Sequence, residues 1–359
     1  MLAEMEKYFS NDRINCFDTM SNSLSTGTYS ILENQKRDTW DSFLDTNSIG
    51  NLWQTIDYGE FSKKIFPHMR TLRLVAVRNG VIEGIAQGMF SKFLGFGTVM
   101  NIQEAPLLSM MSIDKVGVLQ SIILALEKLG VKNRVMQIKI EWPSKWGYVD
   151  LFSSMGYEHV GTNIAYTVNL SGGAEDLWKR INGNKRRNIQ KALDRGVEIN
   201  ESSSFEDIKK FYALFSDLAK RHNFSPSKLS WFQTIWNSRS QKDSSKIFFA
   251  RWQGEDISSV FVTIHAKTIY ALGWGYLGTS LEVRPNELLH WKIMEWGCKR
   301  GFLRYYMGYV QPEAKGVHEM GIWRWKREWN GDQDPVYVFR KSVSKYGFIE
   351  KLYDTLKKH

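Results

Sequence analysis

The segment SKIFFARWQGEDISSVFVTIHAK (residues 245–267) decides the fold of this chain. Two runs rich in Phe, Ile and Val flank a short polar stretch with a glycine, and this pattern predicts two strands joined by a tight turn. A third apolar run, TIYALGWGYLG (268–278), predicts the next strand. The sequence NELLHWKIMEWGCKRGF (286–302) then predicts a helix that ends at Gly301, and RYYMGYV (304–310) predicts the strand after it.

The same order of elements is expected about 175 residues earlier. TLRLVAVRNGVIEGIAQGMFSK (71–92) predicts a hairpin, because an Asn-Gly pair between alternating apolar residues is a strong turn signal. FGTVMNIQ (96–103) predicts a third strand. DKVGVLQSIILALEKLGVK (114–132) predicts an amphipathic helix ending at Gly130, and NRVMQIKIEW (133–142) the strand after it. The two halves share few identical residues, so the repeat is one of pattern.

A mixed sheet with one long helix laid over it is the plan of the GNAT acyltransferases. We therefore expect an α/β (α+β) protein with two tandem GNAT-like domains and a cleft between them. The expected domains are 51–170 and 171–344, the second carrying a basic helix at 184–195. Residues 1–50 are polar and are expected to form an irregular or helical lead-in that packs on the first domain. A C-terminal helix at 345–359 is expected to return to the same domain.

The charge balance points to an anionic partner. The chain has 359 residues, with 48 Lys and Arg against 38 Asp and Glu, which gives a net charge of +10. Such an excess favours nucleic acid, a phosphorylated substrate or an acidic membrane surface. Cys16 and Cys298 are isolated, and no CxxC or HExxH pattern occurs, so we expect no metal site and a reducing compartment. We expect neither a signal peptide nor a membrane-spanning helix, and hence a cytoplasmic protein, with peripheral contact to an anionic membrane as a further expectation.

The segment GNKRRNIQKALDRGVEI (183–199) concentrates the positive charge. Three apolar residues share one helix face, which we expect to be buried: Ile189, Ala192 and Leu193. Three cations spaced by four residues form a stripe on the other side: Arg187, Lys191 and Arg195. The candidate phosphate contacts are Lys185, Arg186, Arg187 and Lys191. The alternative interpretation is an ordinary solvated helix face.

Four segments together resemble the FemABX family of aminoacyltransferases. LWKRINGNKRRNIQKALDRGVEI (177–199) resembles the family's Leu-Trp helix followed by a basic Asn-Ile run and a closing Gly. The stretch 270–309 resembles its strand, Pro-Asn-x-Leu-Leu-x-Trp helix and Arg-Gly-Phe sequence. GIWRWKREWNGDQDPVYVF (321–339) resembles its Gly-x-x-x-Phe-Lys block, and NLWQTIDYGEF (51–61) its motif with Gln and an aromatic-Gly pair. The resemblance spans roughly residues 50 to 345.

This resemblance implies a twin GNAT-like fold and a reaction. An aminoacyl group would pass from aminoacyl-tRNA to an amine, in known family members that of a peptidoglycan-precursor peptide. The chemistry needs no metal, no covalent enzyme intermediate and no cofactor beyond the aminoacyl-tRNA co-substrate. By resemblance, Lys326 would stabilise negative charge at the reacting carbonyl or contact the tRNA terminus. Trp325 would stack on a terminal base, and its alternative is an ordinary core position.

Other candidate substrate contacts lie in the same half. Arg284 could orient a carboxylate or phosphate, and Asn286 is expected to cap the helix that follows it. Tyr305 and Tyr306 could face the cleft, with one of them in the core. The chain departs from the family where Tyr306 stands in place of the usual Asp.

Two other functions remain open. The first is an acyl-CoA-dependent N-acyltransferase, whose phosphate loop usually reads Arg/Gln-x-x-Gly-x-Gly/Ala. RINGNK (180–185) and RWQGED (251–256) approach this pattern, and both miss its last position. The second is a non-enzymatic module that binds RNA or a membrane surface through the basic stripe and aromatic residues.

Overall fold

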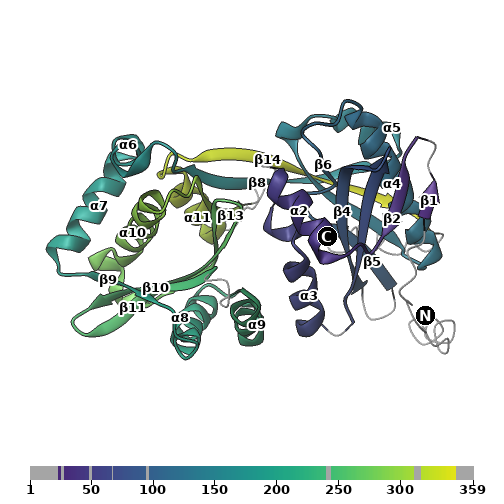
Figure 1. Cartoon of the computed structure of the whole chain (residues 1–359). Helices are drawn as coiled ribbons and strands as arrows, with labels where there is room; N and C mark the ends of the chain where they lie inside the picture. Colours follow the sequence, from purple (N-terminus) through teal and green to yellow (C-terminus); the bar gives the residue numbers. More distant parts are fainter. Residues whose placement is uncertain are drawn as a thin grey trace, which may run out of the picture. The chain divides into compact units, whose positions relative to one another are not determined.

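The computed structural model describes residues 23–25, 28–47, 51–66, 68–93, 97–239, 244–310 and 317–344 (Figure 1). The chain divides into two compact units. Unit 1 comprises residues 1–161 and 337–359, and unit 2 comprises residues 162–336. The helix expected at 345–359 lies outside the described residues. No helix within the described ranges is long and apolar enough to cross a membrane.

The boundaries between the units fall inside two long strands. β8 (Glu158–Asn169) begins in unit 1 and ends in unit 2, whereas β14 (Asp332–Ser342) begins in unit 2 and ends in unit 1. These boundaries differ from those expected at 170/171 and 344. LSGG (170–173) has the composition of a linker, but it forms a tight turn after β8, with the Gly173 amide donating to the Leu170 carbonyl over 3.0 Å.

Unit 1 is built on a mixed sheet with the strand order β1-β2-β3-β4-β5-β7-β14, and β6 pairs with β4. The strands from β2 to β5 pair antiparallel, and β5 and β7 run parallel. The remaining strands are β1 (Ser23–Ser25), β2 (Ser30–Glu33), β3 (Arg70–Arg78), β4 (Val81–Phe93), β5 (Gly97–Ile102), β6 (Leu107–Leu108) and β7 (Gln137–Pro143). The helices are α2 (Arg37–Thr46), η1 (Leu52–Gln54), α3 (Ile56–Ile65), α4 (Lys115–Lys132), η2 (Ser144–Trp146) and α5 (Val149–Ser154).

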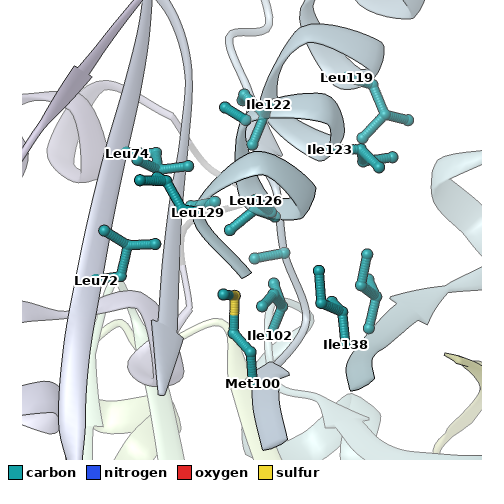
Figure 2. Close-up of a cluster of buried hydrophobic side chains, with 14 of the residues drawn as sticks. Leu72, Leu74, Met100, Ile102, Leu119, Ile122, Ile123, Leu126, Leu129 and Ile138 are labelled. Carbon is teal, nitrogen blue, oxygen red and sulfur yellow. The ribbon is translucent and has the colours of Figure 1, made fainter. Parts of the chain in front are cut away.

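Alternation along β3 assigns its side chains to two faces of the sheet. Leu72 and Leu74 face α4, together with Met100, Ile102 and Ile138 of the neighbouring strands (Figure 2). Val75, the residue after Leu74, faces the other side and belongs to a second cluster with Trp40 and Phe43 of α2. Both faces of this sheet are therefore covered by helices.

Helix α4 runs two residues beyond its expected end. Asp114 caps its N-terminus, with Oδ1 accepting from the Gly117 amide over 2.9 Å. Gly130 is buried inside the last turn rather than placed after it, and a Cβ there would make an ordinary van der Waals contact with Ile138 Cδ1 at 3.4 Å.

The lead-in expected as irregular or helical contains a strand of the sheet. β2 pairs with β3, and its Ile31 is fully buried in the unit 1 core. Helix α2 buries Trp40, whose Nε1 donates to the Gln54 carbonyl over 2.7 Å. A four-residue strand with only two apolar residues, Ile31 and Leu32, gives too weak an alternation to be recognised from the sequence.

The strands of unit 2 have the order β14-β8-β13-β12-β11-β10-β9, and both parallel and antiparallel pairs occur among them. The remaining strands of unit 2 are β9 (Glu198–Ser202), β10 (Ser245–Trp252), β11 (Glu255–His265), β12 (Thr268–Tyr276) and β13 (Arg304–Val310). Its helices are α6 (Gly173–Arg180), α7 (Gly183–Asp194), α8 (Asp207–Arg221), α9 (Leu229–Arg239), η4 (Gly278–Val283), α10 (Pro285–Lys299) and α11 (Val317–Arg327). Figure 1 shows α10 and α8 on opposite faces of this sheet.

The predicted repeat is confirmed at the level of topology. In unit 1, β3, β4 and β5 pair antiparallel, α4 follows, and β7 pairs parallel with β5. In unit 2, β10, β11 and β12 pair antiparallel, α10 follows, and β13 pairs parallel with β12. Even the hairpin turns correspond, since Asn79-Gly80 and Gln253-Gly254 all have positive φ. Two left-handed residues are what a two-residue hairpin turn requires.

The close packing of α8 on the unit 2 sheet requires a glycine in β12. A Cβ on Gly275 of β12 would lie 2.3 Å from the backbone of Leu214 and Phe215 in α8. Only a residue without a Cβ lets the helix backbone approach the strand this closely. This approach sets α8 beside the end of β12, where a cavity opens.

Candidate functional site

Unit 2 contains a cavity of about 900 Å³ bounded by α8, β12, η4, α10 and α11. Most of its lining is apolar and aromatic: Phe215, Leu218, Phe224, Trp274, Ile322 and Trp325. A smaller set of polar groups also faces it: Arg221, His222, Arg284, Asn286, Glu287 and His290. Substrate sites in proteins commonly combine these two kinds of lining at volumes of roughly 300–1,000 Å³.

The cavity wall at the start of α10 comes from a strained turn. Arg284 has φ 58°, in the left-handed region, and immediately precedes Pro285, the first residue of the helix. Asn286 is therefore not the N-cap that the sequence suggested. It is the second helical residue, and its Oδ1 accepts a hydrogen bond from Ser258 Oγ over 2.6 Å. The turn places Arg284, Asn286 and Glu287 together on the cavity.

Trp325, the aromatic candidate in α11, lines the cavity with a group of rings. Its ring centre lies 6.5 Å from that of Trp274 with the planes nearly parallel, at 28°. It meets His290 edge-to-face at 4.9 Å and Trp329 at 5.8 Å. Trp325 is half-buried, so part of its ring surface is open to a ligand.

Lys326, the candidate next to it, is 2 % exposed. Its Nζ donates to the Tyr309 carbonyl over 3.1 Å and lies 5.5 Å from the centre of the Trp274 ring. Burial lowers the pKa of this ammonium to about 7. Lys326 does not itself line the cavity. The ring of Trp274, which does line it, is in contact with the Lys326 ammonium. Its position is nevertheless buried and specific, unlike that of an exposed lysine.

Lys326 occupies a gap that the sheet itself creates. β12 and β13 pair over only three residues, from Thr268↔Arg304 to Tyr270↔Tyr306. Beyond Tyr306, β13 continues along β8 after a bulge at Gly308, where φ is 77°. The end of β12 therefore separates from β13, and Lys326 joins the two by contacting Tyr309 on one side and Trp274 on the other.

His290 is a cavity residue that the sequence did not single out. It is 1 % exposed, and its Nδ1 lies 2.7 Å from the hydroxyl of Tyr305. Burial, followed by the positive charges of Lys185 and Lys326, lowers its pKa to about 3. One histidine in an apolar helix gives no recognisable motif, so no sequence signal was present to find it.

Lys185 is not the exposed phosphate contact that the basic helix suggested. It is fully buried and forms ion pairs with Glu328 at 3.2 Å and with Glu287 at 3.6 Å. Burial lowers the pKa of its ammonium, and the two carboxylates partly offset this effect. Its charge is therefore neutralised inside unit 2, where it connects α7 to α10 and to the end of α11.

Arg186 is also engaged within the protein. Its Nη1 donates to the carbonyls of Trp178, Lys179 and Ile181 at 3.1, 3.1 and 2.7 Å, and so caps the C-terminus of α6. Arg187 and Lys191 remain exposed, as the candidate phosphate contacts require.

The apolar face of α7 also differs in one position. Ile189 and Ala192 are buried as expected, but Leu193 is 43 % exposed. The buried stripe is therefore completed by Lys185, four residues before Ile189, rather than by Leu193.

Tyr305 and Tyr306 both belong to the interior. Tyr305 is fully buried, and burial raises the pKa of its hydroxyl well above the ordinary value of 10. Tyr306 is 8 % exposed and packs on Tyr270, with 5.3 Å between the two ring centres. Neither lines the cavity, so the expectation that one of them faces a substrate receives no support from their positions. In the described part of the chain, no cluster of His, Cys, Asp and Glu could hold a metal ion.

Comparisons with known proteins agree with this topology. Residues 179–327 match a family model described as an acetyltransferase (GNAT) domain. No curated protein matches the chain in sequence. Among solved structures, FemX is similar with a TM-score of 0.74 and 15 % identity, over 89 % of this chain and 99 % of FemX.

Two further structures extend the comparison. A tandem GNAT protein from the clavulanic acid biosynthesis pathway has a TM-score of 0.58 and 9 % identity, over 88 % of this chain and 99 % of its own. L-PGS from Bacillus licheniformis has a TM-score of 0.51 and 13 % identity, over 76 % of this chain and 86 % of its own. The cavity lies in the segment that matches the acetyltransferase model. The chain is therefore a protein of the GNAT acyltransferase fold, with two GNAT-like units in tandem as in the fold of FemX.

Proposed function

We propose that this protein is an aminoacyltransferase that moves an amino acid from aminoacyl-tRNA to an amine of a peptidoglycan-precursor-like peptide. The observation that carries the proposal is the position of Trp325 and Lys326. The first lines the unit 2 cavity, and the second is buried beside it at the gap between β12 and β13. This pair stands where the FemABX-like aromatic-Lys block falls in the sequence.

The proposed reaction forms a peptide bond in one transfer. The acceptor amine attacks the ester carbonyl carbon, a C–N bond forms, and the C–O bond to the tRNA ribose breaks. The proton lost by the amine leaves with the ribose oxygen. Negative charge develops on the carbonyl oxygen during attack, so fixed positive charges and hydrogen-bond donors beside the cavity favour the transition state.

Each candidate residue takes a role consistent with its place. Trp325 offers an aromatic surface on which a terminal base or an acyl side chain can stack. Arg284, on the cavity wall, binds a phosphate or carboxylate of the substrate. Lys326 supplies positive charge close to the carbonyl, and its pKa of about 7 makes that charge sensitive to pH in the physiological range. Arg187 and Lys191 contact phosphates of the tRNA outside the cavity.

The second candidate function is acyl-CoA-dependent N-acylation, which the acetyltransferase match over residues 179–327 favours. Two features of the structure weigh against it. RWQGED (251–256) forms the turn between β10 and β11. In RINGNK (180–185), the Asn184 amide already donates to Asn182 Oδ1 over 2.8 Å, so this amide is not free for a phosphate.

A donor test separates the two functions. Purified protein is incubated with a mixture of radiolabelled aminoacyl-tRNAs and, separately, with labelled acetyl-CoA, in each case with a nucleotide-linked precursor pentapeptide as acceptor. Label passing from tRNA to the pentapeptide is the expected result. Label passing only from acetyl-CoA would replace the proposal with the second candidate.

A further inference from the structure

His290 and Tyr305 form a buried pair beside the unit 2 cavity. His290 lies on α10 and lines the cavity, whereas Tyr305 lies on β13 behind it and is fully buried. Nδ1 of the imidazole is 2.7 Å from the tyrosine hydroxyl. Within the described ranges, each of these two groups has the other as its sole hydrogen-bond partner.

This arrangement decides which ring nitrogen carries the proton. A neutral imidazole has one N–H donor and one acceptor, and a tyrosine hydroxyl must place its own proton somewhere. If Nδ1–H donated to the hydroxyl, the tyrosine proton would be buried without an acceptor, which is energetically unfavourable. The favoured state therefore has the Tyr305 hydroxyl donating to Nδ1 of His290, which leaves the proton of the imidazole on Nε2.

The surroundings keep the ring neutral. Lys185 on α7 and Lys326 on α11 both disfavour a positive charge on His290, although Glu287 and Glu328 balance Lys185. The element on the remaining side, β12, presents Trp274, which carries no charge and meets the ring edge-to-face at 5.9 Å. The ring centre of Trp325 lies 4.9 Å from that of His290. The two aromatic contacts restrict the orientation of the imidazole ring.

We propose that the Nε2–H of neutral His290 donates a hydrogen bond to the carbonyl oxygen of the acyl group held in the unit 2 cavity. This inference rests on the proposed function, in that it takes the cavity as the place where the acyl group binds. His290 keeps its proton throughout, so no bond forms or breaks on the ring. This hydrogen bond becomes stronger as negative charge grows on the carbonyl oxygen during attack by the amine, so it stabilises the transition state more than the bound substrate.

The position of His290 explains why such a donor is well suited to this site. A neutral donor, unlike a lysine, does not bind the acceptor's anionic groups before the reaction. It is already aligned by Tyr305, so the reaction needs no reorientation of a mobile group. Tyr305 is accordingly a positioning residue, whereas His290 would touch the substrate.

The first test reads the tautomer without any turnover. The full chain is labelled with ¹⁵N-histidine, and two-bond ¹H–¹⁵N spectra are recorded from pH 5 to pH 8. One of the seven histidines should show the Nε2–H tautomer throughout this range, and its signals should be absent from His290→Gln. Tyr305→Phe should convert this signal to a mixture of tautomers. An Nδ1–H tautomer for His290, or a normal titration in this range, would overturn the proposal.

The second test probes contact with an acyl group. Puromycin carries an aminoacyl group on an amide bond and so resembles an uncleavable aminoacyl-adenosine end. At saturation, it should shift the Nε2–H resonance of His290. An unchanged resonance with puromycin bound would contradict the proposed contact.

The third test measures transfer. His290→Leu should lower kcat by about 10²–10³-fold with little change in KM, the usual effect of losing one donor to a developing oxyanion. His290→Gln, which keeps an N–H donor, should restore part of the loss. Unchanged kcat in a folded His290→Leu protein would overturn the role. If neither tRNA nor CoA donors are used, the proposed function fails, while the tautomer of His290 is still decided by the spectra.

Discussion

The Nζ of Lys185 lies 4.4 Å from the centre of the Trp325 ring. A residue of the basic helix is thus in direct contact with the aromatic residue of the candidate site. Because Lys185 also pairs with Glu287 of α10, it connects α7 to α10 and α11, two of the helices that bound the cavity. Lys185, which the sequence suggested as a phosphate contact, therefore packs against Trp325 through a cation–π contact.

Lys185→Met should destabilise unit 2. The substitution keeps most of the volume but leaves Glu287 and Glu328 without their buried cation, at a cost of about 3 kcal/mol. Denaturant unfolding gives the change in free energy. Lys191→Met on the exposed side of the same helix is the matched control and should change stability by less than about 0.5 kcal/mol. Equal effects of the two substitutions would contradict the buried ion pairs.

Lys326→Met should alter the pH dependence of stability. Burial lowers the pKa of Lys326 from 10.5 to about 7, so between these values the unfolded chain binds a proton that the folded protein lacks. The free energy of unfolding therefore rises with pH in this window, by at most about 1.4 kcal/mol per pH unit. Below pH 7 the cost of burying the charge is fully present.

The variant should consequently be more stable than the unmodified protein at pH 6 and should show a smaller rise between pH 7 and 10. Urea unfolding at several pH values measures both. Lys191→Met serves again as the control, since an exposed lysine should leave the slope unchanged. Parallel curves for Lys326→Met and the unmodified protein would show that the Lys326 charge is not penalised by burial.

Gly321→Leu should block the cavity without disturbing the fold. Gly321 lines the cavity on α11, and a Cβ there would meet no atom within 4 Å. Leucine also favours a helix by about 1 kcal/mol relative to glycine, so stability should not fall. Transfer activity should drop at least about tenfold, whereas Gly161→Ala, at another open position that does not line the cavity, should retain it. Full activity in Gly321→Leu would place the acyl group elsewhere.

Gly275→Ala should be strongly destabilising. Its Cβ would lie 2.3 Å from backbone atoms of Leu214 and Phe215, so α8 would have to move away from β12. We expect a loss of about 3 kcal/mol, the upper range for forced overpacking. Thermal and urea unfolding measure it, with Gly161→Ala as the tolerated counterpart, because a Cβ there meets nothing within 4 Å.

Arg187→Ala combined with Lys191→Ala should weaken tRNA binding and its dependence on salt. Each lost phosphate contact lowers the slope of log K against log salt by about 0.7–0.9. Filter binding over a range of salt concentrations gives this slope. Lys209→Ala on α8 is a suitable control, since Lys209 is also exposed but pairs with Glu206 at 2.8 Å. A slope unaffected by the double substitution would remove the basic helix from the tRNA interface.

The elements of the central repeat were predictable because local signals agree with the final structure. The Asn79-Gly80 turn and the apolar runs beside it need no distant partner to be recognised. The path of the chain between the units was not predictable in this way. β8 and β14 each cross a boundary, and nothing in the sequence of a single strand tells which unit each of its ends will join.

The candidate site was predictable only in part, for a related reason. Trp325 was found through its resemblance to a family block, and the structure places it on the cavity. Lys185 was misassigned because a helical repeat of cations shows which residues share a face but not which face meets α10. His290 was missed because its chemistry comes from Tyr305, fifteen residues away on a strand.

The placement of β14 also has a consequence for biosynthesis. Its Phe339 is 1 % exposed in the unit 1 core and stacks on Phe152 at 4.5 Å, so unit 1 lacks part of its core until this strand is available. On the ribosome, residues 162–336 emerge before Phe339 does. β14 thus completes both units, because unit 2 takes the residues up to 336 and unit 1 takes Phe339, so neither unit has its full set of strands until nearly the whole chain has been made. We therefore expect the two units to complete their folding together, late in synthesis, rather than one after the other from the N-terminus as in most multidomain proteins.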